Sequence, residues 1–375
     1  MYTKKETAMR IWGAENHSEA FEKFCDNKDY LENEDKKWEK SVSMKFPYYS
    51  SDPLPSPLPT VEEIEAARFT ELELSKDLPC ASHVFKIRDY AVKICSYPGP
   101  LQEAENMVFL EKNCPGLKIP KVYAAYKNQG GDFNLYLKRY PKEYPDRSTL
   151  SPTYLLVTSY ADGPSCYTPV WQSLSQTARN NILRKLGEQM RLLRSVPPPN
   201  PQYYGRIHSQ GFPKDDYVFL GGIQDLTTAW NGPFYSHKDF AGQIMEAGLA
   251  WACVQHGEFN GELQLLLETY EDVMSRASGQ NAILYHGDLQ LHNIIAIENK
   301  DDKDDPDICI IDWATMGWMP AYMETVRTLC RGKASVSMTL DHNTYLYELH
   351  KGDGQAHLET AFYLTNFLAA ANISM

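Results

Sequence analysis

The segment YHGDLQLHNIIAIENKDDKDDPDICIIDW, from Tyr285 to Trp313, holds three oxygen-bearing side chains whose spacing suits phosphate chemistry. Asp288 follows a His-Gly pair, Asn293 lies five residues later, and Asp312 follows an apolar run. Mg²⁺ prefers hard oxygen ligands, and phosphoryl transfer needs positioned phosphates, a neutralising metal and a carboxylate near the attacking hydroxyl. The pattern predicts a site for a metal-bound phosphate; chance spacing in a carboxylate-rich chain is the alternative.

Two short apolar runs, NIIAI and DICII, flank the acidic stretch ENKDDKDDPD. Apolar runs bounded by turn residues predict a buried hairpin, with the acidic stretch as its solvated tip. This hairpin would bring Asn293 and Asp312 together, and Asp288 on the entering loop would face a substrate. The D-x-x-x-x-N spacing is that of the kinase catalytic loop.

A cation for the phosphates has to come from another part of the chain. Strand-like alternation in FTELELS, HVFKI and YAVKI precedes LQEAENMVFLEKN, which has helical spacing. Lys93 places a charge inside the apolar run YAVKI, which predicts a lysine for the α- and β-phosphates of a nucleotide. The next helix offers Glu103 and Glu105 as its partner, and we expect Glu103.

The order of the elements predicts a small sheet with a helix packed on it, followed by a larger helical part. Strand-like NLYLKRY and YLLVTSY follow the first helix, and the pattern is mainly helical after Gly163. A long helix is expected to begin after Ser175 and to end at Pro197. Two more helices are expected at about 238–250 and 262–274.

The N-terminal region differs from the rest of the chain. Its proline-dense stretch FPYYSSDPLPSPLPT excludes helix and sheet interior and predicts an extended connector. Thr60 and Glu63 then form a capping-box signature, so a helix is expected to start near Val61.

Composition limits the classes of protein to which the chain can belong. Its 375 residues, 43% hydrophobic and 23% charged, suit a globular protein with more than one core. A net charge of −12 argues against a nucleic-acid partner. We see no signal peptide or membrane span, and eight scattered cysteines form no C-x-x-C pair. We therefore expect a cytoplasmic protein with reduced thiols that binds neither nucleic acid nor membrane.

Several pieces of the sequence resemble the aminoglycoside phosphotransferase and choline kinase superfamily, and within it a large fungal group. They include YAVKI, QEAENMVFL, LLVTSYADG, YHGDLQLHNII and CIIDWATMGWMPAYMETV. The resemblance implies an α+β, two-lobed, protein-kinase-like fold: a small antiparallel-sheet N-lobe with one main helix, and a larger, mostly helical C-lobe. The expected divisions are an N-terminal extension (1–57), the N-lobe (58–157), an interlobe linker (158–163) and the C-lobe (164–375).

The resemblance also implies a role for each matching residue. Asp288 is expected to be the catalytic carboxylate that orients the acceptor and can deprotonate it. Asn293 and Asp312 are expected to hold Mg²⁺. Lys93 is expected to contact the phosphates of ATP and to pair with Glu103.

The remaining expected contacts are to the nucleotide. The backbone of Ser159, Tyr160 and Ala161 in the linker is expected to bind the adenine. The phosphate loop SKDLPCAS has no glycine, and phosphate contacts are expected near Ser82. Ala314 stands where the family often has a glutamate.

We therefore expect an ATP- and Mg²⁺-dependent kinase that phosphorylates a hydroxyl of a small molecule. One alternative is a catalytically silent kinase-fold scaffold, and another is the same fold recruited to a different acid–base reaction. A third is a metal-hydrolase cluster of His286, Asp288 and His292. The acceptor, the choice between ATP and GTP, the oligomeric state and the role of the first 57 residues stay open in the sequence.

Overall fold

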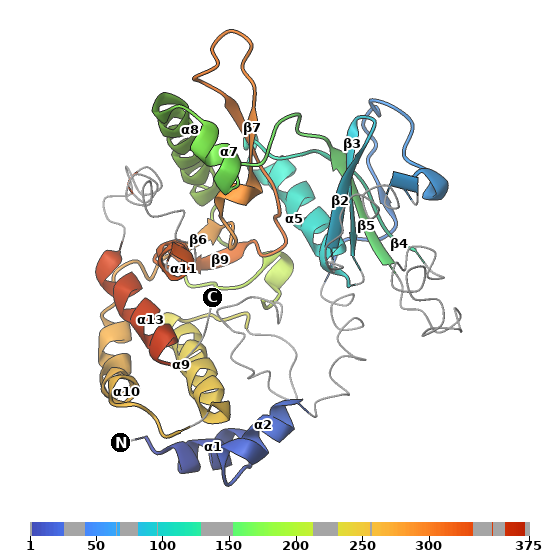
Figure 1. The fold of residues 1–375 in the computed structure, drawn as a ribbon. Helices are drawn as coiled ribbons and strands as arrows, with labels where there is room; N and C mark the ends of the chain where they lie inside the picture. The colour runs from blue at the N-terminus through green and yellow to red at the C-terminus, as the bar shows by residue number, and fades with distance from the viewer. Residues whose placement is uncertain are drawn as a thin grey trace.

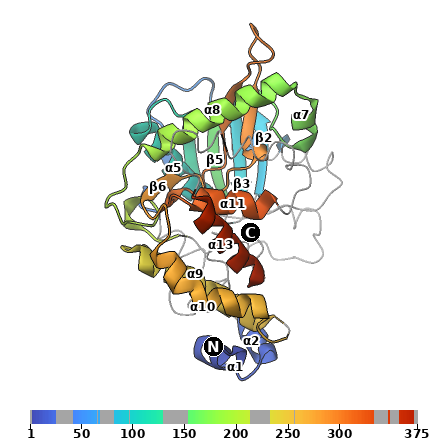
Figure 2. The same cartoon turned by 90° about the vertical axis from the view of Figure 1, so that its left-hand side faces the viewer.

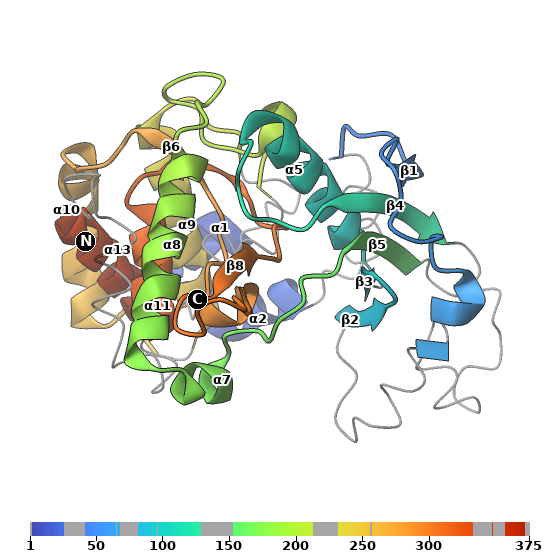
Figure 3. The ribbon, with the colours of Figure 1, turned by 90° about the horizontal axis from the view of Figure 1, so that it is seen from above.

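The structure is a computed structural model. It describes residues 2–25, 42–64, 66–67, 82–95, 97–128, 153–212, 232–255, 257–332, 347 and 357–371. Within these ranges the chain forms a small lobe built on a sheet and a larger lobe built mainly of helices (Figures 1 and 3). The predicted α+β, two-lobed fold is confirmed.

The small lobe is a five-stranded antiparallel sheet with strand order β1-β4-β5-β3-β2. Its strands are β1 (Tyr48–Tyr49), β2 (Ser82–Ile87), β3 (Tyr90–Cys95), β4 (Val122–Asn128) and β5 (Thr153–Ser159). Helix α5 (Gly99–Asn113) packs on β3, β4 and β5. Three predicted strands are confirmed, in HVFKI, YAVKI and YLLVTSY, and so is the predicted helix in LQEAENMVFLEKN. FTELELS and NLYLKRY lie outside the described residues.

Alternation along β3 decides which side chains reach the cleft. Tyr90, Val92 and Ile94 are buried in a core cluster on one face of the sheet. Ala91 and Lys93 therefore point to the opposite face, because successive side chains of a strand alternate. This is the face toward the large lobe, where both residues line a pocket.

The large lobe is built from helices and two short strand pairs (Figure 2). The helices are α7 (Thr168–Ser173), α8 (Gln176–Arg194), α9 (His237–Val254), α10 (Gly261–Ser275), α11 (Met323–Gly332) and α13 (Leu358–Ala370). The strand pairs are β6 (Ala282–Tyr285) with β9 (Gly317–Pro320), and β7 (Ile294–Ile297) with β8 (Asp307–Ile310). The three helices predicted from the sequence are present, and Ser175 caps α8 by accepting a hydrogen bond from the Ala178 N–H.

The N-terminal region contacts both lobes. Helices α1 (Lys4–Trp12) and α2 (His17–Cys25) pack against α9, and Arg10 forms an ion pair with Glu246 at 2.6 Å. Strand β1 instead pairs with β4 at the edge of the small-lobe sheet. The predicted capping box is present, since the Thr60 N–H donates to Glu63 at 2.8 Å and the Glu63 N–H to Thr60 at 3.3 Å. In the described part of the chain no helix is long and apolar enough to cross a membrane.

Candidate active site between the lobes

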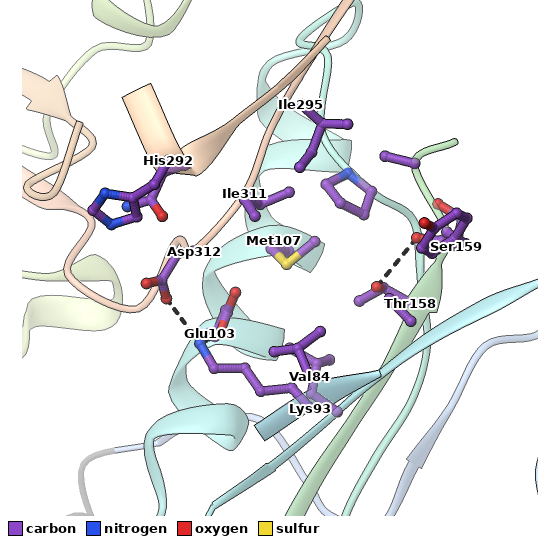
Figure 4. Close-up of a pocket in the computed structure, with 16 residues that line it drawn as sticks. Val84, Lys93, Glu103, Met107, Thr158, Ser159, His292, Ile295, Ile311 and Asp312 are labelled. Carbon is purple, nitrogen blue, oxygen red and sulfur yellow. Dashed lines mark hydrogen bonds and ion pairs between the residues drawn. The ribbon is translucent and has the colours of Figure 1, made fainter. Parts of the chain in front are cut away.

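A pocket of about 360 Å³ lies between the two lobes. The small lobe contributes Lys93 and Glu103, and the large lobe contributes Asp312 (Figure 4) and Asn293. Four of the predicted site residues, far apart in the sequence, therefore meet in one cavity. Its volume falls within the range typical of small-molecule sites.

Lys93 forms ion pairs with carboxylates from both lobes. Its Nζ lies 2.6 Å from Glu103 Oε2 and 2.8 Å from Asp312 Oδ1 (Figure 4). Burial alone would lower the pKa of Lys93, but the attraction of Glu103 and Asp312 raises it well above its usual range. The ammonium is therefore held charged inside the pocket, which is the state that a phosphate requires.

Helix α5 also holds the backbone that follows Asp312. Glu103 Oε1 accepts a hydrogen bond from the Trp313 N–H at 3.3 Å. Asn106 Nδ2 donates to the Trp313 carbonyl at 2.7 Å, and Gln102 Nε2 donates to the Ala314 carbonyl at 2.6 Å. The helix that carries the partner of Lys93 is thus bound to the large lobe directly behind the pocket.

The predicted hairpin is confirmed and brings Asn293 close to Asp312. Strands β7 and β8 pair with Ile294 opposite Ile310, and the Ile311 N–H donates to the Asn293 carbonyl at 2.9 Å. The acidic stretch at its tip is not only solvated. Lys185 on α8 lies 3.0 Å from Asp305, so the tip is also attached to that helix.

Asp288 lies on the loop that follows β6, next to Asn293. Gln290 Nε2 donates to Asp288 Oδ1 at 2.8 Å, which fixes the carboxylate. Asn293 Nδ2 donates to the Asp288 carbonyl at 2.8 Å. This bond orients the Asn293 amide, because only the NH₂ end can donate to a carbonyl. Its side-chain oxygen is the end that could coordinate a cation.

His286 connects this loop to the segment that carries Asp312. The Asp288 N–H donates to Nδ1 at 3.1 Å, so the ring proton is on Nε2, which lies 2.9 Å from the Ile311 carbonyl. Burial lowers the pKa of His286, although the charge of Asp288 acts in the opposite direction. With both nitrogens engaged, His286 is not available as a metal ligand. His292 is exposed, and the described residues contain no cluster of three or more His, Cys, Asp or Glu side chains suited to a metal.

Asp312 adopts an unusual backbone conformation. Its φ is +65°, a left-handed conformation that aspartate tolerates better than most residues. Burial acts to raise the pKa of Asp312, but the adjacent charge of Lys93 outweighs it and holds the pKa below its usual value. The carboxylate is therefore ionised, and one of its oxygens is paired with Lys93.

The linker backbone, which was predicted to bind adenine, is partly engaged in hydrogen bonds within the protein. The Ser159 N–H donates to the Lys121 carbonyl at 2.8 Å and the Tyr160 N–H to the Asp89 carbonyl at 2.9 Å. Both N–H groups are thus used to hold the linker between strands. Among the described residues the Ala161 N–H has no such partner. Ser159, Tyr160 and Ala161 all line the pocket.

Ser82 opens strand β2 opposite Cys95, and its side chain lies outside the part of the chain that the structure describes. Phosphate contacts near Ser82 therefore stay a prediction.

Sequence reasoning missed the apolar walls of the pocket. Figure 4 shows side chains from both lobes around its inner end; they are Val84 and Met107 from the small lobe and Ile295 and Ile311 from the large lobe. A flat ring could lie between these walls. The available signal was position, since Ile295 and Ile311 lie within two residues of Asn293 and Asp312.

Comparisons with known proteins give a family and a fold for the chain. A family model described as "Phosphotransferase enzyme family" matches residues 85–363. The crystal structure of the aminoglycoside phosphotransferase APH(4)-Ia is 13% identical and aligns with a TM-score of 0.51, covering 84% of this chain and 97% of that chain. At this identity the likeness shows the fold alone, which is the two-lobed kinase-like fold.

Two further solved structures align less closely. A ternary complex of a thermostable APH(4)-Ia mutant with AMP-PNP and hygromycin B has 13% identity, coverage of 83% and 96%, and a TM-score of 0.49. The GDP complex of aminoglycoside 2'-phosphotransferase-IIIa has 12% identity, coverage of 82% and 90%, and a TM-score of 0.46. The search of curated proteins found no match.

Proposed function

Because the chain belongs to the phosphotransferase enzyme family, we propose that it transfers the γ-phosphoryl group of ATP to a hydroxyl group of a small molecule. The observation that carries this proposal is the ion-pair cluster in the interlobe pocket. There Lys93 lies within 2.8 Å of a carboxylate from each lobe. A charged lysine beside an ionised aspartate is suited to bind phosphates together with their metal.

The nucleotide is proposed to bind with its base between the apolar walls of the pocket. The Ala161 N–H would donate to N1 of adenine, and the Ser159 carbonyl would accept from its 6-amino group. This pattern fits adenine better than guanine, which presents an N1–H donor and an O6 acceptor at the same two positions. These contacts to the base favour ATP over GTP. Lys93 would then contact the phosphates.

Asn293 and Asp312 fit a Mg²⁺ ion, since they supply an amide oxygen and a carboxylate oxygen on adjacent backbone segments. When bound, Mg²⁺ neutralises the negative charge of the phosphates. The chain's own contribution is to keep these oxygens in place, through the Asn293 bond to the Asp288 carbonyl and the Asp312 pair with Lys93.

Asp288 is proposed as the catalytic carboxylate. Its oxygen would accept the proton of the acceptor hydroxyl while that hydroxyl oxygen forms a bond to the γ-phosphorus. The bond between the γ-phosphorus and the bridging oxygen breaks, and ADP leaves with the electron pair. Gln290, at 2.8 Å from Asp288, would hold the carboxylate toward the acceptor.

Other features of the molecule are part of the same proposal. We take residues 58–157 as the N-lobe, 158–163 as the linker, 164–375 as the C-lobe and 1–57 as an N-terminal extension. The comparisons give no support to the narrower fungal assignment, and a cytoplasmic location stays a prediction.

A screen for phosphoryl transfer tests the proposed function. The purified chain, ATP and Mg²⁺ are incubated with a library of hydroxylated metabolites and aminoglycosides, and the products are examined by mass spectrometry. We expect at least one acceptor to gain a phosphoryl group, and Asp288→Asn to abolish the gain while the folded structure is retained. An active Asp288→Asn enzyme would contradict the role of Asp288. Nucleotide binding without transfer to any acceptor would favour a silent kinase-fold protein.

A further inference from the structure

A junction around a buried ion pair joins three segments that are far apart in the sequence. It contains Ser43 of the N-terminal region, Glu105 on helix α5 and Arg206 of the large lobe. The side chain of Arg206 is 0% exposed and that of Glu105 is 2% exposed. Charges this deeply buried need partners, because removing one partner leaves an uncompensated charge.

The hydrogen bonds of the junction form a closed ring. The Ser43 N–H donates to Glu105 Oε1 at 2.7 Å, and Arg206 Nη2 donates to Glu105 Oε2 at 3.4 Å. Arg206 Nη1 donates to Gln210 Oε1 at 3.2 Å, and Gln210 Nε2 donates to Ser43 Oγ at 3.0 Å. The Met44 N–H adds a second bond to Glu105 Oε1 at 2.8 Å. Each segment is thus bonded to both of the others.

The same helix carries Glu103, the partner of Lys93. Residues two apart on an α-helix point about 200° apart, so Glu103 and Glu105 lie on widely separated sides of α5. Glu103 reaches into the pocket at 2.6 Å from Lys93, whereas Glu105 reaches into the junction. A tilt or rotation of α5 that breaks the junction therefore also moves Glu103.

The large-lobe side of the junction is connected to the catalytic loop. The Gly205 N–H donates to the Trp318 carbonyl at 3.0 Å, and the Trp318 N–H donates back at 2.8 Å. Trp318 belongs to β9, which pairs with β6, and β6 leads directly to His286 and Asp288. The position of Arg206 is therefore fixed relative to β6, the strand that leads to Asp288.

We propose that Glu105 and Arg206 are positioning residues that hold α5 at the angle which keeps Glu103 on Lys93, and that residues 43–44 complete this device. The N-terminal region is then part of the nucleotide site rather than an appendage. The inference rests on the proposed function, because it assumes that Lys93 binds the phosphates of ATP.

The test compares the Mg²⁺–ATP affinity of folded variants by titration calorimetry. Glu105→Gln keeps an acceptor for the Ser43 and Met44 N–H groups but removes the charge that faces Arg206. We expect its dissociation constant to rise on the order of tenfold. The matched control is Glu111→Gln on the exposed side of the same helix, which should bind as the wild type does. A folded Glu105→Gln protein with wild-type affinity would overturn the proposal.

Two further variants separate positioning from general damage. In Lys93→Met the added Glu105→Gln change should weaken binding no further, because Glu105 acts through Lys93; additive losses would overturn the proposal. If Glu105→Gln does not fold, Gln210→Ala takes its place, since it opens the ring at a partly exposed residue without unpairing Glu105. We expect a loss of a few-fold, and wild-type affinity would overturn the proposal. A wild-type chain that does not bind Mg²⁺–ATP would instead count against the proposed function.

Discussion

At the scale of single residues, the site depends on one lysine placed between two carboxylates. Asp312 shares Lys93 with Glu103, at 2.8 Å and 2.6 Å. These two carboxylates satisfy the buried ammonium. The fold itself therefore brings the charged groups of the two lobes together, and such preorganisation lowers the reorganisation that binding of a charged ligand requires.

Part of this arrangement was readable from the sequence. A lysine inside the apolar run YAVKI, a glutamate one helix later and the Asp-Asn-Asp pattern indicated which side chains to bring together. The sequence distinguished less well between Glu103 and Glu105 as the partner of Lys93. The actual partner of Glu105 is Arg206, which lies 101 residues away in the sequence. Such a pairing depends on tertiary packing and leaves no local signal.

Gly287, between His286 and Asp288, is required by its backbone conformation. Its φ is +85°, and a Cβ there would lie 2.6 Å from the Thr315 carbonyl oxygen. We expect Gly287→Ala to lower the free energy of unfolding by about 1–3 kcal/mol and to impair transfer, because the strained loop would displace Asp288. Urea denaturation and the transfer assay measure the two effects.

A glycine of α9 provides the control for this change. At Gly242 a Cβ would meet nothing within 4 Å. Gly242→Ala should therefore stabilise the protein by about 0.5–1 kcal/mol. A Gly287→Ala protein as stable as this control would contradict the steric account.

At the scale of elements, helix α5 is attached to the large lobe along one side. Gln102, Glu103 and Asn106 bond the backbone after Asp312, and the Phe109 ring packs edge-on to Trp318 with centroids 5.8 Å apart. Helical spacing in LQEAENMVFLEKN predicted the helix but not this polar side. A buried Asn, Gln or Glu is the same residue type as an exposed one. The sequence therefore does not show which of them the fold buries.

Asn106 tests this attachment. Asn106→Leu keeps the size of the side chain but removes the donor to the Trp313 carbonyl, which stays buried without that partner. We expect a loss of about 1–3 kcal/mol in the free energy of unfolding, measured by urea denaturation. Asn113→Leu is the control, because Asn113 is at the exposed end of the same helix and donates to the Phe109 carbonyl of that helix at 2.8 Å. Equal effects of the two changes would refute the attachment.

The linker shows another limit of sequence reasoning. Its position in LLVTSYADG was readable, but the Ser159 and Tyr160 N–H groups donate to the Lys121 and Asp89 carbonyls. Which N–H groups remain for a ligand depends on how neighbouring strands end. The hairpin β7–β8, by contrast, was predictable because its two apolar runs and turn lie within one short segment.

At the scale of the whole molecule, buried histidines couple stability to pH. His237 at the start of α9 lies 2.9 Å from the Tyr322 hydroxyl, and burial lowers its pKa to about 4. An unfolded histidine has a pKa of about 6.5. Between these values the unfolded chain binds a proton that the folded chain does not. The contribution of His237 to stability is therefore complete above pH 6.5 and is lost as the pH falls toward 4.

We expect the free energy of unfolding to fall by roughly 2–3 kcal/mol over this range through His237 alone. Denaturation curves at pH 7, 6 and 5 measure the slope, and His237→Gln should be less pH-dependent than the wild type. The exposed His292 is the control, since His292→Gln changes a residue outside the core. An unchanged slope in His237→Gln would show that this imidazole is not the cause.

Lys93, Asn293 and Asp312 are proposed to form one site for a metal–nucleotide complex between the lobes. Titration calorimetry of ATP binding, with Mg²⁺ and with a chelator, tests it most directly in the wild type and in Asp312→Asn. We predict that Mg²⁺ strengthens ATP binding to the wild type and that Asp312→Asn loses most of this effect while remaining folded. Equal ATP affinity with and without Mg²⁺ in the wild type, or an undiminished Mg²⁺ effect in Asp312→Asn, would contradict the claim.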